Sequence, residues 1–285
     1  MMLTKHNTID IYEQDEWPAM LKGVLIYSEN EYGCASHIAM KSLLGEQEPS
    51  GRILTHLINQ MVFNQSKDFE SVGWEYYFYN DYMIININKW PTTPIMPLHE
   101  AQATWIHCYP PVRDLLSFLK DKYYQSSAMA PSMLAFVTST TLHDSLNTDI
   151  FAIHSPEDML MYQHKDSIKL NISGQQDPKP QLKTDLFFTP PAWLFPHLAN
   201  AMGMNYPVTL FSGHDPESGD IDEVAALTLF RWLNRTTGNH TNKHAFNRSL
   251  KNTKREVAVA LKMRNDLEAM LKSDEETEAP NVLWG

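Results

Sequence analysis

The sequence predicts an α/β domain with a layered α/β/α arrangement, a mostly parallel central sheet and one antiparallel hairpin. Several short apolar runs are continuous rather than alternating, which is typical of strands buried on both faces of a sheet. Segments with apolar residues at three-to-four spacing fall between these runs, as the helices of a parallel sheet do. A content of 43% hydrophobic and 20% charged residues is that of a globular protein.

The predicted strands are the segments in which the apolar runs occur. They are residues 23–28, 73–79, 82–88, 103–108, 133–139 and 207–212. Only Asn80 and Asp81 separate the second strand from the third, and this pair of residues is suited to a tight turn. We therefore expect these two strands to form the antiparallel hairpin.

The predicted helices share an apolar side with helical spacing. They are residues 35–44, 52–63, 111–123, 191–202 and 249–272. Proline at or near the first position favours the start of the third and fourth of these helices. A further helix is expected from Asp220, because an aspartate N-cap with Glu223 three residues later forms a variant of the capping box.

The domain organisation follows from this order of elements. Residues 1–272 are predicted to form a single α/β domain. Residues 166–183, which contain Gly174, Pro178 and Pro180, read as a mobile loop or insertion within it. Residues 273–285 are predicted to be a flexible acidic tail, because a run with acidic side chains at four of five positions does not pack into a core.

Composition excludes several classes of function. The formal net charge of −11 argues against nucleic acid or an anionic membrane as the main partner. The two cysteines, Cys34 and Cys108, exclude a disulfide framework and an all-cysteine zinc site. No signal-type run occurs in residues 1–30 and no apolar stretch approaches a membrane span. The expected location is the cytoplasm, with the nucleus as a second compartment.

Motifs that bind phosphate or activate a serine are absent from the sequence. Neither G-x-x-x-x-G-K, G-x-G-x-x-G nor G-x-S-x-G occurs. His240 and His244 are four residues apart, but no cysteine or acidic residue lies beside them, so a solvated loop is the better interpretation. We therefore expect no metal, no cofactor and no catalytic set.

One loop, residues 212–220, supports an alternative interpretation as an active site. It follows a predicted buried strand and precedes a capped helix, which is where α/β folds place ligands. His214, Asp215 and Glu217, with Asp220, are residue types that act as acid, base or metal ligand. A phosphorylase- or hydrolase-like enzyme is thus the second hypothesis, and a polar turn is the simpler explanation of the same residues.

The C-terminal tail suggests a binding function. An acidic run from Asp274 to Glu278 is followed by Val282, Leu283, Trp284 and the terminal Gly285. A large aromatic residue on such a tether is most simply buried by another protein, with the α-carboxylate bound by a lysine or by backbone amides. Two other arrangements are open: Trp284 fills a groove on its own domain, or the tail docks in a neighbouring copy of a homo-oligomer.

The order of the last hundred residues resembles that of the proteasome assembly chaperones. The resemblance rests on T-P-P-A-W-L-F-P-H-L at 189–198, Y-P-V-T-L-F-S-G-H-D at 206–215, D-E-V-A-A-L-T-L-F-R-W-L at 222–233 and the terminal N-V-L-W-G. It is greatest to the first subunit of the heterodimeric chaperone that escorts the α-ring. Members of that family end in a hydrophobic-tyrosine-any tripeptide, and Trp284 stands here at the tyrosine position.

The resemblance implies a specific function. It implies a fold similar to that of the nucleoside phosphorylases, without catalysis. Its implied partners are a second chaperone subunit, with which the chain forms a heterodimer, and the α subunits of the proteasome core particle. Leu283, Trp284 and the Gly285 carboxylate would then enter a pocket between adjacent α subunits.

Overall fold

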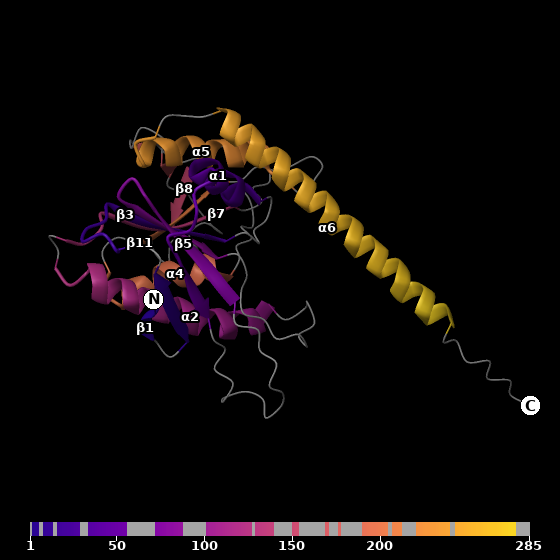
Figure 1. Ribbon diagram of the computed structural model, residues 1–285, viewed down its shortest axis with the longest axis horizontal. Coiled ribbons are helices and arrows are strands. Elements are labelled where there is room, and N and C mark those ends of the chain that lie inside the picture. Colours follow the sequence, from indigo (N-terminus) through magenta and orange to yellow (C-terminus); the bar gives the residue numbers. More distant parts are fainter. Residues whose placement is uncertain are drawn as a thin grey trace, which may run out of the picture.

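The computed structural model of the chain describes most of its residues, and Figure 1 gives their arrangement. The described residues are 2–5, 8–13, 16–28, 34–55, 72–87, 101–126, 129–139, 150–153, 169–170, 176–177, 190–204, 207–212, 221–239 and 243–277.

The centre of the molecule is one mixed sheet, whose described strands follow the order β1-β2-β4-β5-β6-β3-β7-β11-β8-β9-β10. The strands are β1 Met2–Lys5, β2 Ile9–Glu13, β3 Gly23–Ser28, β4 Gly51–Thr55, β5 Val72–Tyr79, β6 Tyr82–Ile87, β7 Met133–Ser139, β8 Ile150–Ile153, β9 Lys169–Leu170, β10 Gln176–Asp177 and β11 Pro207–Ser212. The four central strands β6, β3, β7 and β11 are parallel to one another. Antiparallel strands flank them on both sides.

Helices cover both faces of the sheet, as Figure 1 shows. They are α1 Ala35–Leu44, α2 Ala101–Tyr123, α4 Pro190–Ala201, α5 Glu223–Thr236 and α6 Lys243–Thr277. The helices α2 and α4 pack together on one face, and α1 and α5 pack together on the other, where α6 joins them. The predicted layered α/β/α class is therefore confirmed.

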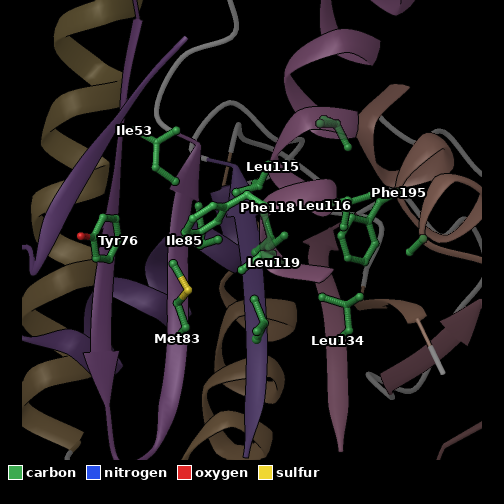
Figure 2. Close-up of a cluster of buried hydrophobic side chains, with 14 of the residues drawn as sticks. Ile53, Tyr76, Met83, Ile85, Leu115, Leu116, Phe118, Leu119, Leu134 and Phe195 are labelled. Carbon is green, nitrogen blue, oxygen red and sulfur yellow. The ribbon is translucent and has the colours of Figure 1, made fainter. Parts of the chain in front are cut away.

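Two hydrophobic clusters, one on each face, hold these layers together. Figure 2 shows the cluster beneath α2, where Leu116, Phe118 and Leu119 lie over the sheet. Ile85 of β6 and Phe195 of α4 belong to the same cluster. Because alternate residues of β3, β6 and β7 face opposite clusters, these strands are buried on both sides, as their continuous apolar runs predict.

The predicted hairpin is confirmed and the parallel part of the sheet is smaller than the sequence suggests. β5 and β6 pair antiparallel with Tyr79 opposite Tyr82. Asn80 and Asp81 have φ angles of 45° and 65°, the left-handed conformation that two-residue hairpin turns require. The strands at both flanks pair antiparallel, and β9 and β10 are two short strands within the predicted loop 166–183.

Residues 103–108, predicted as a strand, are helical and form the first turns of α2. The aromatic and β-branched residues of this segment favour a strand locally, but the amphipathic segment that follows extends the helix backwards through it. Pro110 and Pro111, which the sequence places at a helix start, lie inside α2. The predicted helix 111–123 is confirmed as the second half of α2.

Residues 52–55, predicted as the start of a helix, belong to β4, and residues 56–63 lie outside the described part of the chain. β4 pairs with β2 on one side and β5 on the other, so both of its edges are hydrogen-bonded. The hydroxyl of Tyr76 donates to the carbonyl of Tyr12 across Gly51, at 3.0 Å. A Cβ atom at Gly51 would lie 2.2 Å from that hydroxyl oxygen, so only glycine fits there.

The helices that lead to the C-terminus begin or end at other residues than predicted. The N-cap of α5 is Asp222 rather than Asp220, and its side chain accepts a hydrogen bond from the Ala225 amide at 2.8 Å. α6 extends beyond the predicted 249–272 at both ends. Residues 273–277, predicted as part of the flexible tail, are therefore helical.

Candidate functional site

The helix α6 is the element that carries the C-terminal residues, and Figure 1 shows it extending away from the sheet. Its first turns pack on the α1–α5 face. Phe246 is buried and stacks on Phe230 of α5, with ring centroids 5.4 Å apart. Leu250 packs against the same hydrophobic cluster, and Thr253 is buried. These three residues recur every three to four positions, so one side of the helix faces the body.

Two ion pairs join the same part of α6 to the body. Arg248 binds Glu46 at 2.7 Å, just beyond α1, and Lys254 binds Glu223 in the first turn of α5. All four side chains are well exposed, and exposed pairs contribute only about 0.2–1 kcal/mol each. The attachment of α6 therefore depends mainly on its apolar contacts.

Beyond Glu256 the described side chains of α6 are mostly exposed, including large apolar ones. Val259 is 57% exposed and Met263 is 68% exposed. Ala258, Lys262 and Asp266 are exposed as well. Within the described ranges, no helix has the length and apolar character needed to cross a membrane. The described side chains in this part of α6 form an exposed surface, which continues towards the tail.

The predicted binding residues Leu283, Trp284 and Gly285 lie outside the described part of the chain. The last described residue, Thr277, is the end of α6, and residues 278–285 follow it in the sequence. The insertion of these residues into a partner stays a prediction.

The alternative site is at the carboxyl ends of the parallel strands, where α/β folds bind ligands. Ser212 ends β11, but His214, Asp215, Glu217 and Asp220 lie outside the described residues. The enzyme hypothesis therefore stays a prediction too.

Buried polar residues are present at this edge: Ser28 ends β3, Asn86 lies at the end of β6, and Thr138 and Ser139 end β7. The alternation of the strands places them in two groups. Ser28 and Thr138 share the face of the α2–α4 cluster, whereas Asn86 and Ser139 share the face of the α1–α5 cluster. The four side chains therefore do not converge on one side of the sheet, as the ligands of one small molecule would.

Sequence reasoning overlooked His37, a buried histidine in the first turn of α1. Burial lowers the pKa of His37 to about 4, and the positive charge of Lys41 acts in the same direction. The imidazole is neutral at pH 7. Nothing in the sequence separates this histidine from the eleven others, because the signal is its depth in the fold.

The metal hypothesis gains no support from the described residues. They contain no group of three or more histidine, cysteine or acidic side chains arranged to hold an ion. His244, expected in a solvated loop, lies in the first turn of α6, and His240 is outside the described part.

Comparison with known proteins gives matches in structure alone. No protein-family model matches the sequence, and no curated protein matches it. PbaA of Pyrococcus furiosus, an archaeal homolog of proteasome-assembly chaperone, is similar with a TM-score of 0.53 at 10% identity, over 91% of this chain and 99% of PbaA. PbaB of the same organism, an archaeal proteasome activator, is similar with a TM-score of 0.52 at 11% identity, over 90% of this chain and 99% of PbaB.

This chain has the fold of PbaA and PbaB. The likeness covers nearly the whole of PbaA and of PbaB. The predicted resemblance to the proteasome assembly chaperones, which rested on the last hundred residues, is confirmed in the fold. At these identities the likeness establishes architecture, and the position of this chain as one subunit of a heterodimer stays a prediction.

Proposed function

We propose that this chain is a non-enzymatic chaperone of proteasome assembly. It binds the α-ring of the core particle as half of a heterodimer with a second chaperone subunit. Leu283, Trp284 and the Gly285 carboxylate enter a pocket between adjacent α subunits. The fold shared with an archaeal homolog of proteasome-assembly chaperone supports this proposal, and so does the resemblance of the C-terminal segments. The protein acts in the cytoplasm and nucleus.

The observation that carries the proposal is the length of α6, which extends away from the sheet as far as Thr277. Glu256 is still near enough to His37 of α1 for its charge to act on the imidazole. From Glu256 to Thr277 the helix rises about 31 Å at 1.5 Å per residue. Residues 278–284 reach at most about 25 Å even when fully extended. A tail of that length returns Trp284 to α1 only if it runs fully extended back along the helix, which favours a pocket on another protein.

The chemistry of the tail fits a pocket that is apolar inside and basic at its base. Burial of the Trp284 indole supplies contact area, and aromatic anchors of this kind dominate many interfaces. A lysine in the pocket would neutralise the terminal carboxylate through a charge-assisted hydrogen bond. The acidic residues from Asp274 to Glu278 precede these groups and would guide the tail towards basic rims, chiefly by raising the association rate.

The decisive experiment removes Leu283–Gly285 and measures binding to isolated α-rings. We expect the deletion to weaken binding while the melting temperature of the chain stays unchanged, because the proposal places these residues in a pocket of another protein. Undiminished binding would contradict the tail mechanism.

Substitutions of Trp284 then separate the side chain from the carboxylate. Trp284→Ala should cost on the order of 2 kcal/mol in binding, the usual range for an aromatic anchor. Trp284→Tyr is the matched control and should be nearly neutral, because tyrosine retains most of the ring burial. Extension of the chain by a few residues past Gly285 should be as damaging as Trp284→Ala. A loss of melting temperature in Trp284→Ala without a loss of affinity would instead indicate that the tail docks on its own domain.

A further inference from the structure

The projecting part of α6 has apolar side chains with the spacing of a helix-pairing seam. Val259 and Met263 are four residues apart and both are exposed. Along the sequence, Leu267 and Met270 continue the spacing at four and three residues. Ala260, Met263, Leu267 and Met270 lie three, four and three residues apart, and this alternation is the pattern of residues that pack between two paired helices. The surface is therefore suited to another helix.

The charges of α6 change sign part-way along the helix. Residues 243–264 contain seven basic residues and one acidic residue, Glu256. Residues 265–277 contain five acidic residues and one basic residue, Lys272. The change falls between Arg264 and Asp266, in the exposed part of the helix.

This distribution opposes the helix dipole. Acidic residues stabilise the N-terminus of a helix and basic residues its C-terminus, by about 0.3–1 kcal/mol each. α6 has no acidic residue in its first turn and no basic residue in its last turn. A single long helix of this kind lacks favourable charges at both ends, so a partner that supplies the opposite pattern would stabilise it.

A second copy of the same helix, running in the opposite direction, supplies that pattern. Antiparallel pairing places the basic half of each helix beside the acidic half of the other, and each acidic C-terminus beside a basic segment. Parallel pairing would instead place like charges side by side over the whole length. With the two-fold axis at Asn265, Met263 lies level with Leu267 of the second copy, and Ala260 lies level with Met270. The apolar positions therefore meet in the same register that brings the charges together.

We propose that α6 pairs in antiparallel orientation with α6 of a second copy of this chain, along residues 255–275. The paired segment is about 31 Å long, which is three heptads. The interface is short, so the pairing depends on protein concentration and on ionic strength. It does not rest on the proposed function, because it needs neither the tail nor the α-ring.

Two charge variants of the full chain test the pairing. In the first, Lys262→Glu and Arg264→Glu make the centre of the helix acidic. In the second, Asp266→Lys and Glu268→Lys make it basic. Sedimentation velocity over a range of concentrations should show a monomer–dimer equilibrium for the unchanged chain, and dissociation constants at least tenfold higher for either variant alone. An equimolar mixture of the two should recover the dimer.

Three outcomes would overturn the proposal: an unchanged chain that stays monomeric at all concentrations, a dimer that neither variant weakens, or a mixture that fails to recover it. Removal of Leu283–Gly285 is the matched control and should leave the dimer unchanged. Loss of the dimer in that deletion would show that the tail, rather than α6, joins the copies. This control separates the present proposal from the α-ring proposal, because only the latter needs the tail.

Cross-linking tests the orientation. Ala260→Cys and Met270→Cys chains should form a disulfide with each other when mixed, identified by the masses of the linked peptides. Each chain alone should not, because ten residues of helix, or about 15 Å, separate identical positions in an antiparallel pair. Efficient self-linkage of the Ala260→Cys chain would indicate parallel helices and contradict the proposal.

Discussion

The sheet body and the projecting part of α6 differ in the burial of their apolar residues. In β3 all six residues are buried, and helices cover both faces of the strand. In α6 beyond Glu256, Val259 and Met263 are exposed, although the helix continues to Thr277. Buried apolar area is the main source of stability. We therefore expect stability to depend on the body, and interactions with other molecules to depend on α6 and the tail.

Substitution of one apolar residue in each region gives the largest contrast. Leu119 of α2 is fully buried in the cluster of Figure 2, and Leu119→Ala should lower the free energy of unfolding by about 2–5 kcal/mol. Met263→Ala should change it by less than about 0.5 kcal/mol, because little area is buried there. Denaturant unfolding of both variants measures the contrast. Equal losses would mean that Met263 is buried in the isolated chain, which would contradict the contrast between the sheet body and the projecting part of α6.

The body was largely predictable from sequence because its strands are buried on both faces. Residues 23–28 and 133–139 form continuous apolar runs, and both coincide with strands. Prediction failed where local propensity and tertiary context disagree. Residues 103–108 are rich in strand-forming residues but continue a helix, whereas residues 52–55 begin a helical pattern but pair on both edges as β4. Such pairing is decided by residues far away in the chain.

The candidate site is a prediction from the sequence alone, because its residues lie outside the described part of the chain. Leu283 and Trp284 stand out in sequence because they follow an acidic run. The length of α6, which determines how far from the body the tail begins, was underestimated because the acidic residues 273–277 were expected to be unfolded. Helix continuation there depends on the turns before it, since helix propagation adds residues at low cost once a nucleus exists.

A smaller effect concerns pH and the face on which α6 is anchored. Burial, aided by Lys41, lowers the pKa of His37 to about 4, against 6.5 for an exposed histidine. Between pH 4 and 6.5 the unfolded chain therefore binds a proton at His37 that the folded chain does not. The free energy of unfolding is highest above pH 6.5 in this respect, and it falls by at most about 3 kcal/mol as the pH is lowered towards 4.

Denaturant unfolding at a series of pH values checks this loss. Between pH 6.5 and 4 the free energy of unfolding changes with pH, and His37 contributes the part of this slope that disappears in His37→Gln. Carboxylates contribute the rest. The slope is the readout, since His37→Gln also changes packing and lowers stability at every pH. An unchanged slope in the variant would show that the pKa of His37 is the same in the folded and the unfolded chain, and that the α1 face admits more water than the structure indicates.

The smallest predicted effect is at Asp222, where the body meets the helices of the C-terminal third. Its carboxylate accepts from the Ala225 amide at 2.8 Å and caps α5, so Asp222→Ala should lower the free energy of unfolding by about 1 kcal/mol. Asp222→Asn is the matched control and should retain most of the cap, because an asparagine oxygen accepts the same hydrogen bond.

The cap of α5 is linked to the attachment of α6, because Phe246 of α6 packs against Phe230 of α5. Hydrogen exchange in residues 243–253 should therefore rise in Asp222→Ala while exchange beyond residue 259 stays the same. A rise along the whole of α6 would mean that its projecting part also depends on the body, and the contrast between the two regions would then be wrong.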